Sequence, residues 1–234
     1  MTIGGLQKVT LIDYPGKIAC TVFLTRCNFR CPFCYSRELV LEEEIEKQPK
    51  MNIDDFFSFL EEKKGMLDAC VVCGGEPTLD SQLKDFLKRI KKMGFLVKID
   101  TNGYLPEKLK ELIDENLVDY IAMDIKAPLN EEKYSQAAGI KVDVERIKKS
   151  IELIKNSGID YEFRTTVVPG FHRKEDLVEM ARAIGPAKRY FLQSFRGEKG
   201  TLDSNLEGIK PFAEEEIREA IKEISFLFEV CKSR

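Results

Sequence analysis

The chain has 234 residues, of which 43% are hydrophobic and 33% are charged, the composition of an ordinary globular protein. Its formal net charge of -3 supplies no basic surface for nucleic acid or anionic lipid, so neither is an expected partner. The sequence contains no run of about eighteen apolar residues and no basic, apolar leader, which predicts a cytoplasmic protein that does not span a membrane.

Strand-like apolar runs alternate with helical repeats along the chain. A short strand over residues 9–11 and a turn at Pro15-Gly16 predict an N-terminal hairpin with a second strand over residues 17–25. Further strands are predicted over residues 68–73, 95–100, 119–125, 159–168 and 189–195, with helices between them marked by apolar residues at helical spacing. A last helix is predicted through Ile217, Ala220, Ile221, Ile224 and Phe228.

Six β/α units with right-handed crossovers predict an α/β fold, built either as an open sheet or as a barrel. No repeat, linker or low-complexity tract divides the sequence. We therefore expect one domain, with an N-terminal extension over residues 1–16, a core over 17–195, and a loop and C-terminal helix over 196–234. In barrel enzymes the functional side chains gather at the C-terminal ends of the strands, so polar motifs at those positions are the candidates.

The most informative motif directly follows the strand at 17–25. Cys27, Cys31 and Cys34 stand within eight residues, and such closely spaced thiolates form a metal-binding loop. Three protein ligands leave one metal position open, which indicates chemistry rather than a structural zinc site with four ligands. The total of seven cysteines is odd, which also favours metal binding over a set of disulfides.

The C-x3-C-x2-C spacing, with an aromatic residue before the last cysteine, resembles the signature of the radical S-adenosylmethionine (SAM) enzymes. The resemblance implies that Cys27, Cys31 and Cys34 hold a [4Fe–4S] cluster whose fourth iron is chelated by SAM. It also implies that Phe33 and Tyr35 lie beside the adenine of SAM, and that the core is a partial (β/α)6 barrel, open on one side to a large substrate.

A second motif, Gly74-Gly75-Glu76, follows the strand at 68–73. The two glycines allow close approach of the backbone, and the carboxylate of Glu76 can accept hydrogen bonds from an ammonium group. These residues resemble the GGE motif of the same family. That likeness implies that Gly74, Gly75 and Glu76 bind the methionyl amine of SAM.

Two more motifs follow the next strands and resemble the activating enzymes of glycyl-radical enzymes. They are Asp-Thr-Asn-Gly at residues 100–103 and Asp-x-Lys at residues 124–126. The likeness implies that a monovalent cation is held near the SAM carboxylate by Asp100, Thr101 and Asp124, whose oxygen atoms suit a hard cation. It also places Asn102 at the cofactor and brings Lys126 to the SAM carboxylate.

The strand at 159–168 carries an arginine within an otherwise apolar run. A buried guanidinium needs an anionic partner, so Arg164 either faces SAM or the substrate, or forms a salt bridge inside the barrel. Gln193 on the last predicted strand is a further candidate for the cofactor site. His172, the only histidine, is predicted to be a surface residue at a helix start.

The likeness extends over most of the chain to one branch of these activases, the activating proteins of anaerobic ribonucleoside-triphosphate reductase. It rests on the opening Gly4-to-Lys17 stretch, on the motifs above and on the Arg-Thr-Thr-Val-Val-Pro-Gly strand. It implies reductive cleavage of SAM to a 5′-deoxyadenosyl radical, which takes a hydrogen from a glycine Cα of the partner enzyme. A flavodoxin- or ferredoxin-type electron donor and an anaerobic setting are implied as well.

Two other functions remain open at this point. The chain could be a radical SAM enzyme that acts on a small molecule. It could instead be a non-catalytic zinc-binding adaptor, with Cys70 and Cys73 completing a four-cysteine site. Residues three apart on a strand point to opposite faces, so we interpret Cys70 and Cys73 as packing residues, together with Cys20 and Cys231.

Overall fold

A computed structural model describes residues 1–234, except for the side chain of Lys199. The chain forms two compact units. Unit 1 comprises Met1–Asn28, Ser36–Thr101 and Glu107–Ile121. Unit 2 comprises Phe29–Tyr35, Asn102–Pro106 and Ala122–Arg234. The expectation of one domain, with its three segments, stays a prediction.

Unit 1 contains an antiparallel hairpin followed by parallel strands. The strands are β1 (Ile3–Thr10), β2 (Ala19–Leu24), β3 (Ala69–Gly74) and β4 (Leu96–Thr101). β1 is antiparallel to β2, and β2, β3 and β4 are parallel. The helices are α1 (Arg37–Val40), α2 (Glu42–Lys47), α3 (Ile53–Glu62), α4 (Leu83–Lys92), α5 (Pro106–Asp114), whose first residue belongs to unit 2, and the 3₁₀ turn η1 (Pro77–Leu79).

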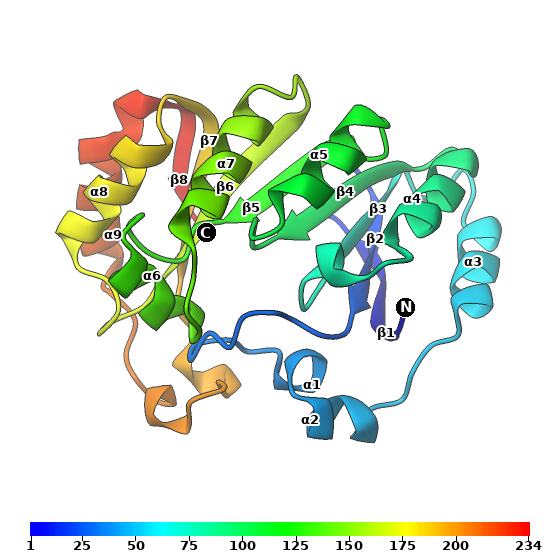
Figure 1. Cartoon of the computed structure of the whole chain (residues 1–234), viewed down its shortest axis with the longest axis horizontal. Coiled ribbons are helices and arrows are strands. Elements are labelled where there is room, and N and C mark those ends of the chain that lie inside the picture. The colour runs from blue at the N-terminus through cyan, green and yellow to red at the C-terminus, as the bar shows by residue number, and fades with distance from the viewer. The chain divides into compact units, whose positions relative to one another are not determined.

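The predicted hairpin is confirmed, but its first strand is longer than expected. β1 begins at Ile3 and includes Gly4, where a Cβ atom would lie 2.5 Å from the end of the Leu39 side chain, so this glycine lets the strand pack closely on α1 rather than form a turn. Asn52 caps the start of α3: its side chain accepts a hydrogen bond from the backbone N–H of Asp54 at 3.0 Å. The buried rings of Phe56 and Phe86 stack on each other. This contact joins α3 to α4, which are neighbours in Figure 1.

Unit 2 consists of parallel strands and the helices that follow them. β5 (Tyr120–Asp124) begins in unit 1 and ends in unit 2. The other elements are α6 (Glu131–Ala138), α7 (Val144–Lys155), β6 (Asp160–Val167), α8 (Lys174–Ile184), β7 (Ala187–Ser194), α9 (Glu214–Ile224), β8 (Phe228–Ser233) and the 3₁₀ turns η2 (Gly197–Lys199), η3 (Ser204–Leu206) and η4 (Ser225–Leu227). Figure 1 shows α8 and α9 side by side next to β8.

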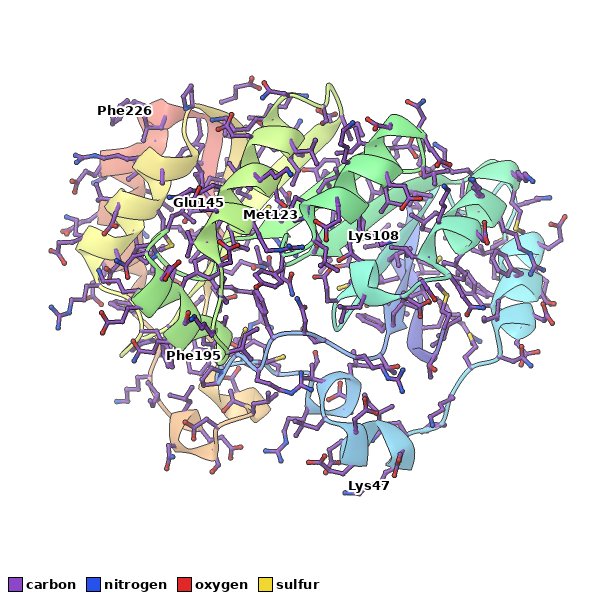
Figure 2. The ribbon with its side chains drawn as sticks, viewed as in Figure 1. Lys47, Lys108, Met123, Glu145, Phe195 and Phe226 are labelled. Carbon is purple, nitrogen blue, oxygen red and sulfur yellow. The ribbon has the colours of Figure 1, made fainter. Side chains whose placement is uncertain are left out.

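The last helix is shorter than the sequence predicted. α9 ends at Ile224, and the chain turns at η4 before Phe228 begins β8, which pairs in parallel with β7. The turn leaves Phe226 79% exposed, outside the ribbon (Figure 2). Phe228 fits the helical spacing of the apolar residues before it. The sequence pattern therefore could not show that the helix had ended and a strand had begun. The helices α1, α2 and α6 were also missed.

The described strands follow one another in hydrogen-bonding order from β1 to β8, so the sheet is open and only β1 is antiparallel to its neighbour among the pairings described within the two units. The predicted α/β class and the incomplete barrel are thereby confirmed. Within the described residues, no helix is both long enough and apolar enough to cross a membrane.

Candidate active site

The cysteine loop follows the C-terminal end of β2. Cys27 belongs to unit 1, and Cys31 and Cys34 belong to unit 2. In unit 2 the backbone N–H of Cys34 donates to the carbonyl of Cys31 at 3.0 Å, which curls the loop. The N–H of Arg30 donates to the carbonyl of Ala138 at the end of α6, 2.8 Å away. Hydrogen bonds within unit 2 therefore fix the shape of the loop between its last two cysteines.

The segment at 196–211, which the sequence left without a role, holds this loop. The N–H groups of Leu202 and Asp203 donate to the carbonyls of Cys34 and Pro32 at 3.0 and 2.9 Å. The hydroxyl of Tyr35 accepts from the N–H of Arg196. Three hydrogen bonds thus join residues 196–203 to the cysteine loop.

None of the three cysteines of the loop forms a disulfide, and neither do the other four cysteines of the chain. Burial raises the pKa of Cys31 to about 11, although Lys126 acts in the opposite direction. A bound metal would deprotonate such a thiol outright. Among the side chains that the structure describes, no three His, Cys, Asp or Glu residues stand ready to hold a metal ion. The assignment of Cys27, Cys31 and Cys34 as ligands therefore rests on their spacing in the chain.

The two aromatic candidates beside the cysteines pack against aromatic rings of unit 2. Phe33 meets Phe171 edge-to-face with ring centroids 5.4 Å apart, and Tyr35 stacks on Phe195 at 5.8 Å. These contacts hold the rings in place. Their contact with the adenine of SAM stays a prediction.

Gly74 and Gly75 let the end of β3 lie directly against the chain that leaves β2. A Cβ on Gly74, whose φ is +120°, would lie 2.2 Å from the carbonyl oxygen of Leu24. A Cβ on Gly75 would lie 2.0 Å from the carbonyl oxygen of Arg26. The backbone N–H groups of Gly75 and Glu76 donate to those same two carbonyls at 2.9 and 2.8 Å. The close approach that the two glycines predict is therefore found between two backbone segments of unit 1, the end of β3 and the chain that follows β2.

Glu76 is 1% exposed and connects the ends of β3 and β4. Its Oε1 accepts from the hydroxyl of Thr101 at 2.8 Å and from the N–H and hydroxyl of Thr78 at 3.1 and 2.5 Å. The structure thus brings together two residues that the sequence assigned to SAM, Glu76 and Thr101. A buried carboxylate with this many donors is held in one orientation.

The residues around Thr101 have their own partners. Asp100 accepts from the ammonium group of Lys98, whose side chain is 2% exposed. In unit 2, Asn102 accepts from the backbone N–H of Tyr104 at 3.0 Å, which closes the turn that the Asn-Gly sequence predicts. The cation assigned to Asp100, Thr101 and Asp124 stays a prediction.

In unit 2, Asp124 at the end of β5 pairs with two cations. Its Oδ2 accepts from Nζ of Lys126 at 2.9 Å, and its Oδ1 accepts from Nε of Arg164 at 2.8 Å. Burial opposes the charge on Asp124, but Arg164 and Lys126 outweigh it and hold the pKa of that carboxyl well below its usual range. Burial likewise opposes the charge on Lys126, yet Asp124 raises the pKa of the ammonium group well above its usual range. Both groups stay ionised at neutral pH.

Of the two alternatives for Arg164, the structure shows the salt bridge, and a contact with SAM or the substrate stays a prediction. Arg164 forms this salt bridge inside unit 2, and its partner is Asp124, itself a candidate site residue. Gln193 lies half-buried on β7, opposite Thr166 of β6, and its part in the cofactor site stays a prediction.

The prediction for His172 was wrong: the residue is buried, with 2% of its surface exposed. Its Nδ1 accepts from the N–H of Val168 at 2.9 Å, so Nε2 carries the proton and donates to the carbonyl of Lys126 at 2.8 Å. Burial lowers the pKa of His172, which favours this neutral ring. The turn after Val168 brings His172 back to the end of β6, where its N–H donates to the carbonyl of Val168 at 3.0 Å. The position of His172 in the sequence did not indicate this contact.

Tyr134 is a second residue that the sequence analysis missed, because α6 was not predicted. Its side chain is fully buried, and its hydroxyl accepts from the N–H of Lys126 at 3.4 Å. Tyr134 and His172 thus hold the backbone of Lys126 from both sides. Both residues of the predicted Asp-x-Lys motif are therefore held by buried partners in unit 2: Lys126 by Tyr134 and His172, and Asp124 by Arg164.

Comparison with known sequences now decides the family. Residues 21–184, which include the cysteine loop, both glycines, Glu76, Asp124 and Arg164, match the radical SAM superfamily. The chain belongs to the radical SAM superfamily. As a radical SAM oxidoreductase it uses a [4Fe–4S] cluster and SAM, and the hypothesis of a non-catalytic zinc adaptor is set aside. None of these three cysteines is held in a disulfide, so the loop keeps the three thiol donors that such a cluster requires.

One curated relative covers nearly the whole radical SAM chain. It is named a putative glycyl-radical enzyme activating enzyme of Methanocaldococcus jannaschii, is 34% identical over 222 residues, and covers 93% of this chain and 89% of its own. Among solved structures, SuiB of Streptococcus suis bound to S-adenosylmethionine aligns with a TM-score of 0.67 at 14% identity, over 91% of this chain and 51% of SuiB. QueE from Escherichia coli aligns with a TM-score of 0.59 at 15% identity, over 100% and 94%. These two structures support the radical SAM fold alone.

Proposed function

We propose that this radical SAM enzyme is the activase of a glycyl-radical enzyme. The observation that carries the proposal is the 34% identity, over almost the full length of both chains, to a relative that bears that name. When bound, the reduced cluster supplies one electron that cleaves SAM to methionine and a 5′-deoxyadenosyl radical, which abstracts the Cα hydrogen of a glycine in the partner. The preferred partner is anaerobic ribonucleoside-triphosphate reductase, on the sequence likeness described above.

The chain's own residues would bind and orient the cofactors. Cys27, Cys31 and Cys34 would hold the cluster, and the buried carboxylate of Glu76 would accept from the amino group of SAM. In unit 2, Lys126 would attract the SAM carboxylate, with Asp124 and Arg164 fixing its position. Phe33 and Tyr35 would lie against the adenine. No protein side chain is required to move a proton, which agrees with a histidine that is buried and neutral.

The remaining assignments are proposals on the same footing. A flavodoxin- or ferredoxin-type protein would deliver the electron, and a monovalent cation would sit among Asp100, Thr101 and Asp124. The cytoplasmic location and the anaerobic setting stay predictions of the sequence. A radical SAM enzyme acting on a small molecule is the competing function.

The decisive test uses anaerobically reconstituted protein with SAM, dithionite and a purified anaerobic ribonucleoside-triphosphate reductase. We expect the electron paramagnetic resonance doublet of a glycyl radical in the reductase, and 5′-deoxyadenosine in about equal amount. SAM cleavage that proceeds at the same rate with or without the reductase, and that leaves no such doublet, would instead support the small-molecule function.

Glu76→Gln should weaken SAM binding about tenfold while leaving the iron content unchanged. Glutamine keeps an oxygen that accepts from Thr101 but lacks the negative charge that pairs with an ammonium group, and charge-assisted hydrogen bonds are roughly twice as strong as neutral ones. The measurement is calorimetric titration of the reconstituted protein with SAM. Glu111→Gln, which removes a half-buried carboxylate on α5 that pairs with Lys84, is the matched control. Equal SAM affinity in the two variants would remove Glu76 from the site.

A further inference from the structure

Five charged side chains of unit 2 form a continuous ionic row. Lys126 pairs with Asp124 at 2.9 Å, and Asp124 pairs with Arg164 at 2.8 Å. Nη1 of Arg164 lies 4.0 Å from Oε1 of Glu162. Glu162 in turn accepts two hydrogen bonds from Arg234, at 3.0 and 3.1 Å. We call these five residues the ionic row; its charges alternate from Lys126 to Arg234.

Strand geometry explains why the row is continuous. Glu162 and Arg164 are two residues apart on β6, so their side chains leave the same face of the strand. Arg234 directly follows β8, where its N–H donates to the carbonyl of Leu192 at 2.9 Å. Its guanidinium lies 3.5 Å from the centroid of the Phe191 ring on β7. Arg234 is thus fixed by its backbone, by an aromatic face and by a two-pronged bond to Glu162.

Glu162 lies between Arg234 and Arg164, so Arg234 can affect the rest of the ionic row only through it. Its side chain is 1% exposed, and a buried carboxylate is stable only with cationic partners. Two arginines compete for it: Arg234, which makes the close two-pronged contact, and Arg164, which stands at 4.0 Å. With Arg234 in place, Arg164 directs its Nε to Asp124. Without Arg234, the attraction of Glu162 would draw Arg164 away from Asp124.

The charges of the row determine what it can bind. Its five members carry three positive and two negative charges, so the row has a net positive charge, and its Lys126 end is the end that the proposed function assigns to SAM. A buried cationic site attracts an anionic group. Removing Arg234 would lower the net charge of the ionic row to zero. It would also weaken the pairing of Arg164 with Asp124. Cys31 and Tyr134 are the other acidic groups that face Lys126 within unit 2.

We propose that Arg234 and Glu162 are positioning residues for the carboxylate site of SAM: Arg234 neutralises Glu162, which keeps Arg164 on Asp124 and leaves Lys126 to the carboxylate of the ligand. This inference rests on the proposed role of Lys126 in the activase. It extends the site from the cofactor motifs to the last strand of the chain, which no motif marks.

The test compares two ligands on anaerobically reconstituted protein. SAM carries the carboxylate, whereas 5′-methylthioadenosine has the same nucleoside without the amino-acid chain. Arg234→Ala should weaken SAM binding about three- to tenfold, the size of coupling expected between residues of one ionic network. It should leave the affinity for 5′-methylthioadenosine and the iron content unchanged. Arg218→Ala, which removes a guanidinium paired with Glu215 on the exposed side of α9, is the matched control and should change neither affinity.

Rescue separates positioning from a general loss of structure. Glu162→Gln combined with Arg234→Ala removes both charges, so Arg164 stays with Asp124 and most of the SAM affinity should return. Arg234→Lys should be intermediate, since one ammonium group replaces the two-pronged contact. If the double variant binds SAM no better than Arg234→Ala, or if both ligands or the iron content are affected alike, the proposal is wrong.

The wild-type protein separates this proposal from the proposed function. SAM binding with the predicted response to Arg234→Ala, but no glycyl radical in the partner, would keep the positioning role and reject the activase. A glycyl radical in the partner, together with an unchanged SAM affinity in Arg234→Ala, would keep the activase function and reject the positioning role. Wild-type protein that holds the cluster but does not bind SAM would overturn the positioning role.

Discussion

Replacing Cys31 with alanine should abolish both the iron–sulfur cluster and the cleavage of SAM. A cubane held by three thiolates has no substitute ligand nearby in the loop, and the loss of one ligand leaves an iron bound only by its sulfides. We expect iron and sulfide to fall from about four each per chain to near zero, the brown colour to be lost, and 5′-deoxyadenosine formation to drop by at least about a thousandfold. Metal analysis and product chromatography after anaerobic reconstitution measure these quantities.

Two controls make that result specific. Cys231→Ala removes a free, half-buried thiol from β8 in the same unit and should keep the cluster. Cys31→Ser retains the size of the buried side chain, so a shared loss of the cluster in the alanine and serine variants would not be due to a packing defect at this buried position. Full SAM cleavage by Cys31→Ala would overturn the assignment of the three cysteines.

Gly75→Ala should have the second largest effect, because a methyl group has no space at this position. Its Cβ would lie 2.0 Å from the carbonyl oxygen and 2.5 Å from the carbonyl carbon of Arg26, both rigid backbone atoms. To relieve the contact, the two backbone segments must separate and lose their hydrogen bonds from Gly75 to Leu24 and from Glu76 to Arg26. We expect a loss of about 3 kcal/mol in the free energy of unfolding, or about 6–12 °C in Tm for a chain of this size.

Gly5→Ala is the matched control for this change. Gly5 lies on β1 of the same unit, and its Cβ would meet Phe23 at 3.6 Å, an ordinary contact. The control should change Tm by no more than about 2 °C. Because Arg26 precedes Cys27 directly, Gly75→Ala should also reduce cluster content in protein that remains folded at low temperature. If Gly75→Ala had the same Tm as Gly5→Ala, the backbone segments around Gly75 and Arg26 could separate with little loss of folding free energy.

The strands were predictable because their apolar runs are bounded by clear turn signals. β2 through β7 lie within about two residues of the predicted ranges, since Gly94 and Gly158 close the preceding helices before new apolar runs begin. Short or polar elements were not predictable in this way. α6 contains Glu, Lys, Ser and Gln around one buried tyrosine, and β8 continues an apolar repeat that belongs to a helix up to Ile224.

The same division holds for the candidate site. The cysteine spacing, the Gly-Gly-Glu motif and the Asp-x-Lys motif are local patterns, so they could be found without a structure. Tyr134, His172, Glu162 and Arg234 act through hydrogen bonds and ion pairs that join distant parts of unit 2. Nothing in their neighbouring residues marks them.

By itself, the sequence determined the α/β class, the thiolate loop and the family to which the chain belongs. These properties depend on local spacing: three thiols within eight residues, and glycines placed directly after a strand. The tertiary structure alone decided that Gly75 serves a contact between two backbone segments, that residues 202–203 hold the cysteine loop, and that Arg234 reaches Glu162. Such contacts depend on which strand ends lie together in the folded chain. Buried ion pairs in particular form between residues that become neighbours only when the strands pair.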